Sequence, residues 1–311
     1  MECDAMVQMF QRSVELYNTA YAYYIGDGDS KTFSALLNAR IYDNIIPKKL
    51  ECVGHVQKRM GRWLRNIKNT YKEAAKATKS RSASLEGKGK LTASLIDKLT
   101  VYYGLAIRNN CDSVQNMKDA IWATFYHKIS TDVKPQHVYC PPAANSWYTW
   151  QKAKAEGSVK NYKHQPALPE IVQTAIKSVY EALSKEDLLQ RCMGGYTQNN
   201  NESYNQMIWK LASKITFGSL RIVEIAAYVS ASVFNDGADS YLRIMDLLDI
   251  QVGRNAYEYC QQEDSNRLKH ARIKAQQATR EARIARRLSL SKQHMTNEAQ
   301  EGTSYGAGIA E

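Results

Sequence analysis

The sequence contains no run of about 20 apolar residues, so it predicts no membrane-spanning helix. Its first residues, Met1-Glu2-Cys3-Asp4, lack the basic and then apolar pattern of a secretion signal. Six cysteines scattered over 311 residues are too few for a disulfide scaffold, which indicates a reducing compartment. No Cys-x-x-Cys pair is present, and this excludes redox chemistry by a vicinal pair.

Acidic residues are outnumbered, with 31 Asp and Glu against 42 Lys and Arg, a net charge of +11 and a pI near 9.2. This balance favours an anionic partner, and nucleic acid more than a membrane. A chain of this length can bury a substantial core in one or two domains.

Strand-like segments are also scarce, and the clearest is the aromatic run from Tyr21 to Ile25. Apolar residues at helical spacing are common, so we predict a mainly α fold with a small β component. Thr92 and Asp112-Ser113 are suited to cap helices, the first ending near Gly104. The other expected helices are 6–16, 30–39, 54–78, a stretch from 169, one around 185, and 202–235, with irregular structure at 132–164.

Two acidic signals lie far apart in the chain. Asp27 and Asp29 follow the expected strand in a Gly-Asp turn, and Glu202 falls in the first turn of a helix that begins in an Asn-rich segment. Carboxylates on a strand end and on a helix can hold divalent metal ions, and two such ions can clamp a phosphoryl displacement. The alternative is a turn Asp and a helix-capping Glu.

Cysteine and histidine also occur in two mirrored pairs, Cys52-x-x-His55 and His137-x-x-Cys140. Two thiolates and two imidazoles could form a tetrahedral structural Zn²⁺ site, with His127 as a substitute ligand. The alternative is that these are ordinary core or turn residues.

The helix expected after His55 concentrates positive charge, because 58–90 contains eleven Lys or Arg and only two acids. Its cations recur every three or four residues and therefore share one face. Such a face can contact DNA phosphates without reading bases, or it can be merely solvated. The candidate DNA-binding residues are Lys58, Arg62, Arg65, Lys68, Lys72 and Lys76.

The order of these motifs resembles the Mutator-like transposases, and most closely those of arthropod genomes. The residues that carry the resemblance are Gly26-Asp27-Gly28-Asp29, Cys52-x-x-His55 and Asn199-Asn200-Asn201-Glu202, within about 1–240. The resemblance implies a partial RNase-H-like core with a large helical insertion. It further implies catalytic Asp27 (or Asp29) and Glu202, Mg²⁺ or Mn²⁺, nuclear localisation, transposon-end and target DNA as partners, and a possible homo-oligomer.

In that family the acidic triad begins with an Asp upstream of the Gly-Asp-Gly-Asp segment, and Asp4 does not follow a strand-like run. We therefore expect an N-terminally truncated transposase that does not catalyse strand transfer alone. A non-catalytic DNA-binding or scaffold protein is the alternative, and a helical RNA-binding module is a weaker one.

The expected organisation has five parts, the last two being a long basic helix and a disordered tail. They are a core segment at 1–50, a helical insertion at 51–196, a helical return to the core at 197–262, the basic helix at 263–292 and the tail at 293–311.

Overall fold

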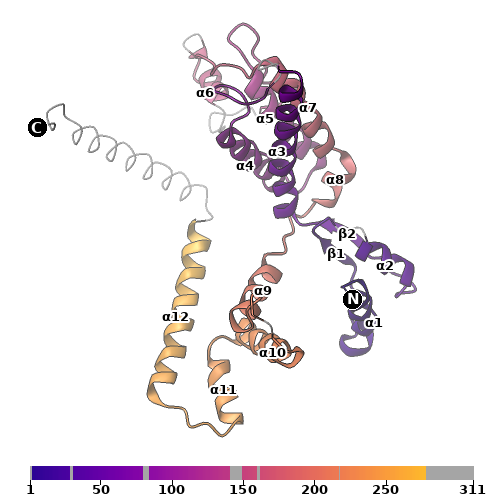
Figure 1. The fold of residues 1–311 in the computed structure, drawn as a ribbon, viewed down its shortest axis with the longest axis vertical. Coiled ribbons are helices and arrows are strands. Elements are labelled where there is room, and N and C mark those ends of the chain that lie inside the picture. The colour runs from indigo at the N-terminus through magenta and orange to yellow at the C-terminus, as the bar shows by residue number, and fades with distance from the viewer. Residues whose placement is uncertain are drawn as a thin grey trace, which may run out of the picture. The chain divides into compact units, whose positions relative to one another are not determined.

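The computed structural model describes residues 2–28, 31–79, 84–140, 149–159, 162–216 and 218–277. The chain divides into two compact units, Met1–Asn200 and Asn201–Glu311. The fold is mainly helical with a small β component, as the sequence predicts (Figure 1). None of the helices in the described ranges is long and apolar enough to cross a membrane.

The first unit begins with a β-α-β arrangement. Helix α1 (Glu2–Tyr17) precedes strand β1 (Tyr23–Gly26), helix α2 (Lys31–Ala39) and strand β2 (Lys48–Glu51). The two strands are parallel, and Gly26 is paired with Glu51 at their carboxyl ends. The sequence indicated β1 to within two residues, whereas β2 has no apolar alternation that would reveal it.

Six helices of the described residues lie in the insertion, and four of them surround one apolar core. Helices α3 (Val53–Ala77), α4 (Ala93–Arg108), α5 (Val114–Ile129) and α7 (Glu170–Leu183) pack against one another. The short helix α8 (Glu186–Arg191) packs on α5 and near β2. Fully buried side chains of this core include Met60, Leu64, Leu99, Tyr103, Ile121, Ile176 and Tyr180.

Local sequence signals set several helix ends as predicted. Thr92 caps α4 by accepting a hydrogen bond from the Leu95 amide, and Ser113 caps α5 through the Asn116 amide. Helix α4 nevertheless continues past Gly104, where we expected it to end. A Cβ at Gly104 would lie 2.2 Å from the Gln57 side-chain oxygen. This glycine therefore allows α3 and α4 to pack closely and does not end α4.

Two other expectations need correction. Helix α6 (Thr149–Ala155) lies within the stretch that we expected to be irregular. The single helical stretch expected at 202–235 is divided into α9 (Asn199–Leu211) and α10 (Leu220–Asp236), with Ser219 capping the second.

The second unit also contains α11 (Asp239–Leu247) and α12 (Arg254–Gln277). Its described helices bury few large side chains, and polar contacts join them instead. Both carboxylate oxygens of Asp264 accept a hydrogen bond from the Ala238 backbone amide. Arg267 donates hydrogen bonds to the carbonyls of Val233 and Phe234 near the end of α10. The described part of the expected basic helix belongs to α12, which starts nine residues earlier than the predicted boundary at 263.

Candidate functional site

Asp27 directly follows β1 and its side chain is exposed. Because β1 and β2 are parallel, their carboxyl ends meet at one edge of the sheet, and Asp27 lies beside the end of β2. The chain turns at Gly28, whose φ of +109° is a conformation that residues with a side chain rarely adopt. The alternative ligand Asp29 lies outside the described residues.

A buried ion pair supports this strand end. Glu51, the last residue of β2, is only 3% exposed and accepts a 2.5 Å hydrogen bond from Arg59 of α3. The same guanidinium group donates to the backbone carbonyl of Asp27 at 3.2 Å. Arg191 of α8 lies 3.5 Å from the other Glu51 oxygen.

Arg59 also explains why the turn requires glycine at position 28. A Cβ on Gly28 would lie 2.3 Å from a guanidinium nitrogen of Arg59. Sequence reasoning missed both Glu51 and Arg59. Glu51 ends a strand that no sequence pattern revealed, and Arg59 was one cation in a basic run.

Cys52 and the segment before Glu202 meet at the same pair of strands. The Gln198 side chain donates to the carbonyl of Ile25 at 2.8 Å, and its backbone amide points to the Cys52 sulfur at 3.3 Å. The Val53 amide also donates to the carbonyl of Tyr196. Residues 196–198 are therefore anchored at β1 and at the start of α3.

Glu202 follows this anchor by four residues, in the first turn of α9, and its side chain is exposed. The helix and its first-turn acid agree with the sequence prediction. Asp27 belongs to the first compact unit and Glu202 to the second. Their joint role as metal ligands remains a prediction.

The two Cys/His pairs have different surroundings. Cys52 is buried and contacts Gln198, whereas His137 and Cys140 contact each other, with 3.6 Å between the sulfur and Nδ1. As the side chains stand, the described residues offer no group of three or more His, Cys, Asp or Glu that could hold a metal ion. The zinc site predicted from Cys52, His55, His137 and Cys140 therefore stays a prediction.

Burial determines the protonation states of His137 and Cys140 at neutral pH. It lowers the pKa of His137 to about 4 and raises the pKa of the Cys140 thiol to about 12. Burial likewise lowers the pKa of His127 to about 4. At neutral pH these imidazoles are uncharged and the thiol is protonated.

The candidate DNA-binding residues lie on α3 as predicted, along one side of the helix. Three of them pair with acids: Arg65 with Asp97 at 2.6 Å, Lys72 with Glu86 at 3.2 Å, and Lys76 with Glu73 at 3.0 Å.

Arg62 and Lys68 form no ion pair within the described ranges, and Arg62 is exposed. The face is thus basic but partly neutralised by the chain's own carboxylates.

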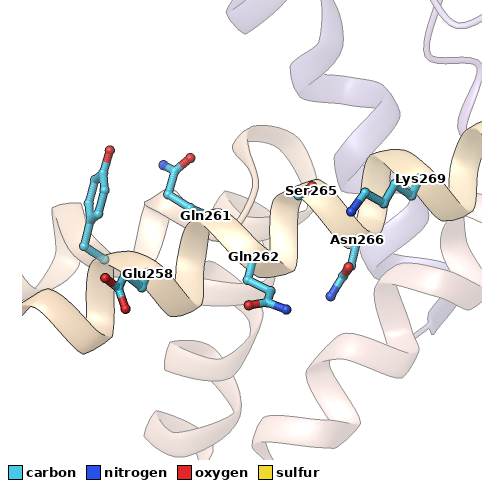
Figure 2. Close-up of a pocket in the computed structure, with 7 residues that line it drawn as sticks. Glu258, Gln261, Gln262, Ser265, Asn266 and Lys269 are labelled. Carbon is cyan, nitrogen blue, oxygen red and sulfur yellow. The ribbon is translucent and has the colours of Figure 1, made fainter.

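The second unit contains two surface hollows, and neither is lined by Asp27 or Glu202. One, of about 460 Å³, runs along α12 and is lined by a tyrosine, a serine, three amides, one acid and one lysine. Figure 2 shows these side chains on that helix. The other, of about 600 Å³, lies among α9, α10, α11 and α12. Its charged lining includes Asp264 and Arg267, which hold those helices together, and also Lys210, Glu263 and His270.

A comparison with known families gives a match to part of the chain. Residues 1–147, which include β1, Asp27, Cys52, His55 and the basic face of α3, match the model of the Mutator-like transposase family. No curated protein and no solved structure matches the chain. Residues 1–147 are therefore similar to the Mutator-like transposase family.

Proposed function

We propose that this transposase-derived chain binds duplex DNA through α3 and presents Asp27 and Glu202 as metal ligands of a phosphodiester-transfer site. The observation that carries the proposal is the position of Asp27. Within the family-matched residues, it is the first residue past β1, at the edge where both parallel strands end.

The β-α-β arrangement supports an RNase-H-like core. A parallel pair of four-residue strands is too small to be stable alone, because parallel sheets are normally larger and covered on both faces. The buried Glu51–Arg59 pair indicates that the strand end is held rigidly, as a metal-binding carboxylate requires. These are properties of a catalytic sheet edge more than of a surface turn.

The DNA-binding part of the proposal is supported by charge and by shape. Helix α3 is 25 residues long, and its inner face is fixed by Val56, Met60 and Leu64 in the core. Its cations are therefore presented on a rigid rod, which suits contact with successive backbone phosphates. Transposon ends and target DNA are the expected duplexes, and this partner would place the protein in the nucleus.

The metal part of the proposal rests on hard oxygen ligands. Mg²⁺ or Mn²⁺ would suit Asp27 and Glu202, because both ions prefer carboxylate oxygen and keep several waters. When bound, such an ion would stabilise the charge that develops on a transferring phosphoryl group. Two carboxylates provide few ligands, so we expect weak binding by this chain and no strand transfer by it alone.

The test is a mobility-shift series on duplex DNA with increasing salt, comparing wild-type protein with Arg62→Glu/Lys68→Glu. We expect the double variant to bind DNA more weakly. The slope of log affinity against log salt concentration should also become shallower by the equivalent of about two phosphate contacts, since each contact contributes about −0.9. The control is Lys177→Glu, an exposed cation on α7 instead of α3, paired with Glu181. Equal affinity of the double variant and the wild type would refute the proposed DNA face.

A further inference from the structure

Three histidines gather at one end of the helical insertion, on residues that the proposed function does not use. His127 lies in the last turn of α5, His137 in the loop that follows, and His164 in the segment before α7. His137 is buried, His127 is half-buried, and the His164 side chain is only 7% exposed. They come from separated parts of the sequence, so only folding brings them together.

Two of the rings face each other through the same nitrogen. His137 Nε2 and His164 Nε2 are 2.9 Å apart, and the ring centres are 5.2 Å apart. Two imidazoles on a tetrahedral zinc ion, with Zn–N of about 2.0–2.1 Å, would have nitrogens about 3.3 Å apart and ring centres about 5 Å apart. The His127 ring centre is 5.7 Å from that of His137, close to the same separation.

The outer nitrogens of both rings have partners. Asp132 Oδ1 lies 2.6 Å from His164 Nδ1 and also accepts the His164 backbone amide. The Cys140 sulfur lies 3.6 Å from His137 Nδ1. In the metal-free protein one Nε2 must carry a proton that the other accepts at 2.9 Å. With an ion bound, each Nδ1 would carry its proton toward these acceptors, and both Nε2 atoms would direct their lone pairs to the ion. A carboxylate on the outer nitrogen is the usual support of a metal-binding histidine.

The His137 ring is also held in place from its face and its backbone. Trp150 stacks on it with ring centres 4.3 Å apart. The Gln151 side chain donates to the carbonyls of His137 and Cys140 at 3.4 and 3.0 Å. The Ser130 hydroxyl lies 3.1 Å from His137 Nε2, and an ion bound at this nitrogen would displace that contact.

We propose that His137 and His164 bind a zinc-class divalent ion through Nε2, with His127 as the third ligand. No three such side chains in the described part of the chain could hold an ion as they now stand, so binding requires rotation of the His127 imidazole. This site retains only His137 from the four-residue zinc prediction and assigns Cys140 to an outer, supporting position. The competing arrangement is a single proton shared between the two Nε2 atoms, with no ion.

The test is titration of the metal-free full-length chain with Co²⁺, followed by visible absorption, with Zn²⁺ competition and equilibrium dialysis for stoichiometry. We expect one tetrahedral Co²⁺ per chain without a thiolate charge-transfer band, displaced by Zn²⁺. His164→Asn and His137→Asn should abolish this binding. Asp132→Asn should weaken it by about 10–100-fold, because it removes only the support of His164.

His55→Asn is the matched control, since it removes the histidine of the other Cys/His pair and should leave Co²⁺ affinity unchanged. Far-UV circular dichroism establishes that each variant is folded. Absence of stoichiometric binding by the wild-type chain, or undiminished affinity in folded His164→Asn, would overturn the proposal. Neither result bears on DNA binding by α3, which involves different residues.

Discussion

The guanidinium group of Arg59 occupies the space that a side chain at Gly28 would need, 2.3 Å from the position of its Cβ. Arg59 is in turn held by the buried carboxylate of Glu51 and donates to the carbonyl of Asp27. The conformation of the turn after β1 therefore depends on a residue of α3. This couples the candidate metal ligand to the packing of the insertion.

Gly28→Ala should destabilise the first unit by about 1–3 kcal/mol, because it combines a strained positive φ with displacement of Arg59. The free energy of unfolding from urea denaturation measures this. Gly87→Ala is the control, since Gly87 has a φ of +119° but no atom within 4 Å of its Cβ. An equal loss of stability in both variants would show that position 28 requires glycine because of backbone strain alone, and not because of the Arg59 contact.

Arg59→Ala should reduce the free energy of unfolding by about 3–5 kcal/mol, because it leaves the carboxylate of Glu51 buried without its closest partner. Arg59→Ala/Glu51→Gln should recover part of this loss, as a double-mutant cycle in denaturant would measure. Arg254→Ala, which breaks the exposed Arg254–Glu258 pair, should change stability by less than about 0.5 kcal/mol. A small effect at Arg59 would mean that Arg191 compensates for its loss.

Asp97→Asn should increase the affinity for duplex DNA several-fold and steepen its salt dependence, because it releases Arg65 from an exposed ion pair. Fluorescence anisotropy with a labelled duplex over a range of salt concentrations would measure both effects. Glu181→Gln removes an equally charged acid from α7 and should produce a smaller change. If both variants bind equally tightly, net charge and not the α3 face determines affinity.

Acid should destabilise the metal-free protein through His127 and His137. Burial lowers the pKa of each to about 4 in the folded state, from about 6.5 in the unfolded state. The unfolded state therefore binds more protons below pH 6.5, and stability falls as pH decreases toward 4, by up to about 1.4 kcal/mol per pH unit for each histidine. Denaturation with a chelator present should show this decline, and His137→Gln should reduce its slope.

Sequence patterns predicted much of the local structure because helix caps and apolar spacing depend on neighbouring residues. Thr92 and Ser113 cap the helices that their types indicate. The same reasoning was wrong at Gly104, where it predicted the end of α4. The glycine instead leaves space for the Gln57 side chain of another helix. The division between α9 and α10 was also missed, since both segments are apolar enough to be read as one helix.

The amino-acid order alone determined the family motifs, the strand that precedes Asp27, the first-turn position of Glu202 and the basic stripe on α3, because each is encoded within a few neighbouring residues. Only the tertiary structure revealed that Arg59 joins Glu51 to the Asp27 turn, that acids neutralise part of the stripe, and that His137 faces His164. Except for the Lys76–Glu73 pair on one helix, those contacts join residues 8 to 32 positions apart. Their geometry depends on how the helices pack, and no local pattern carries that information.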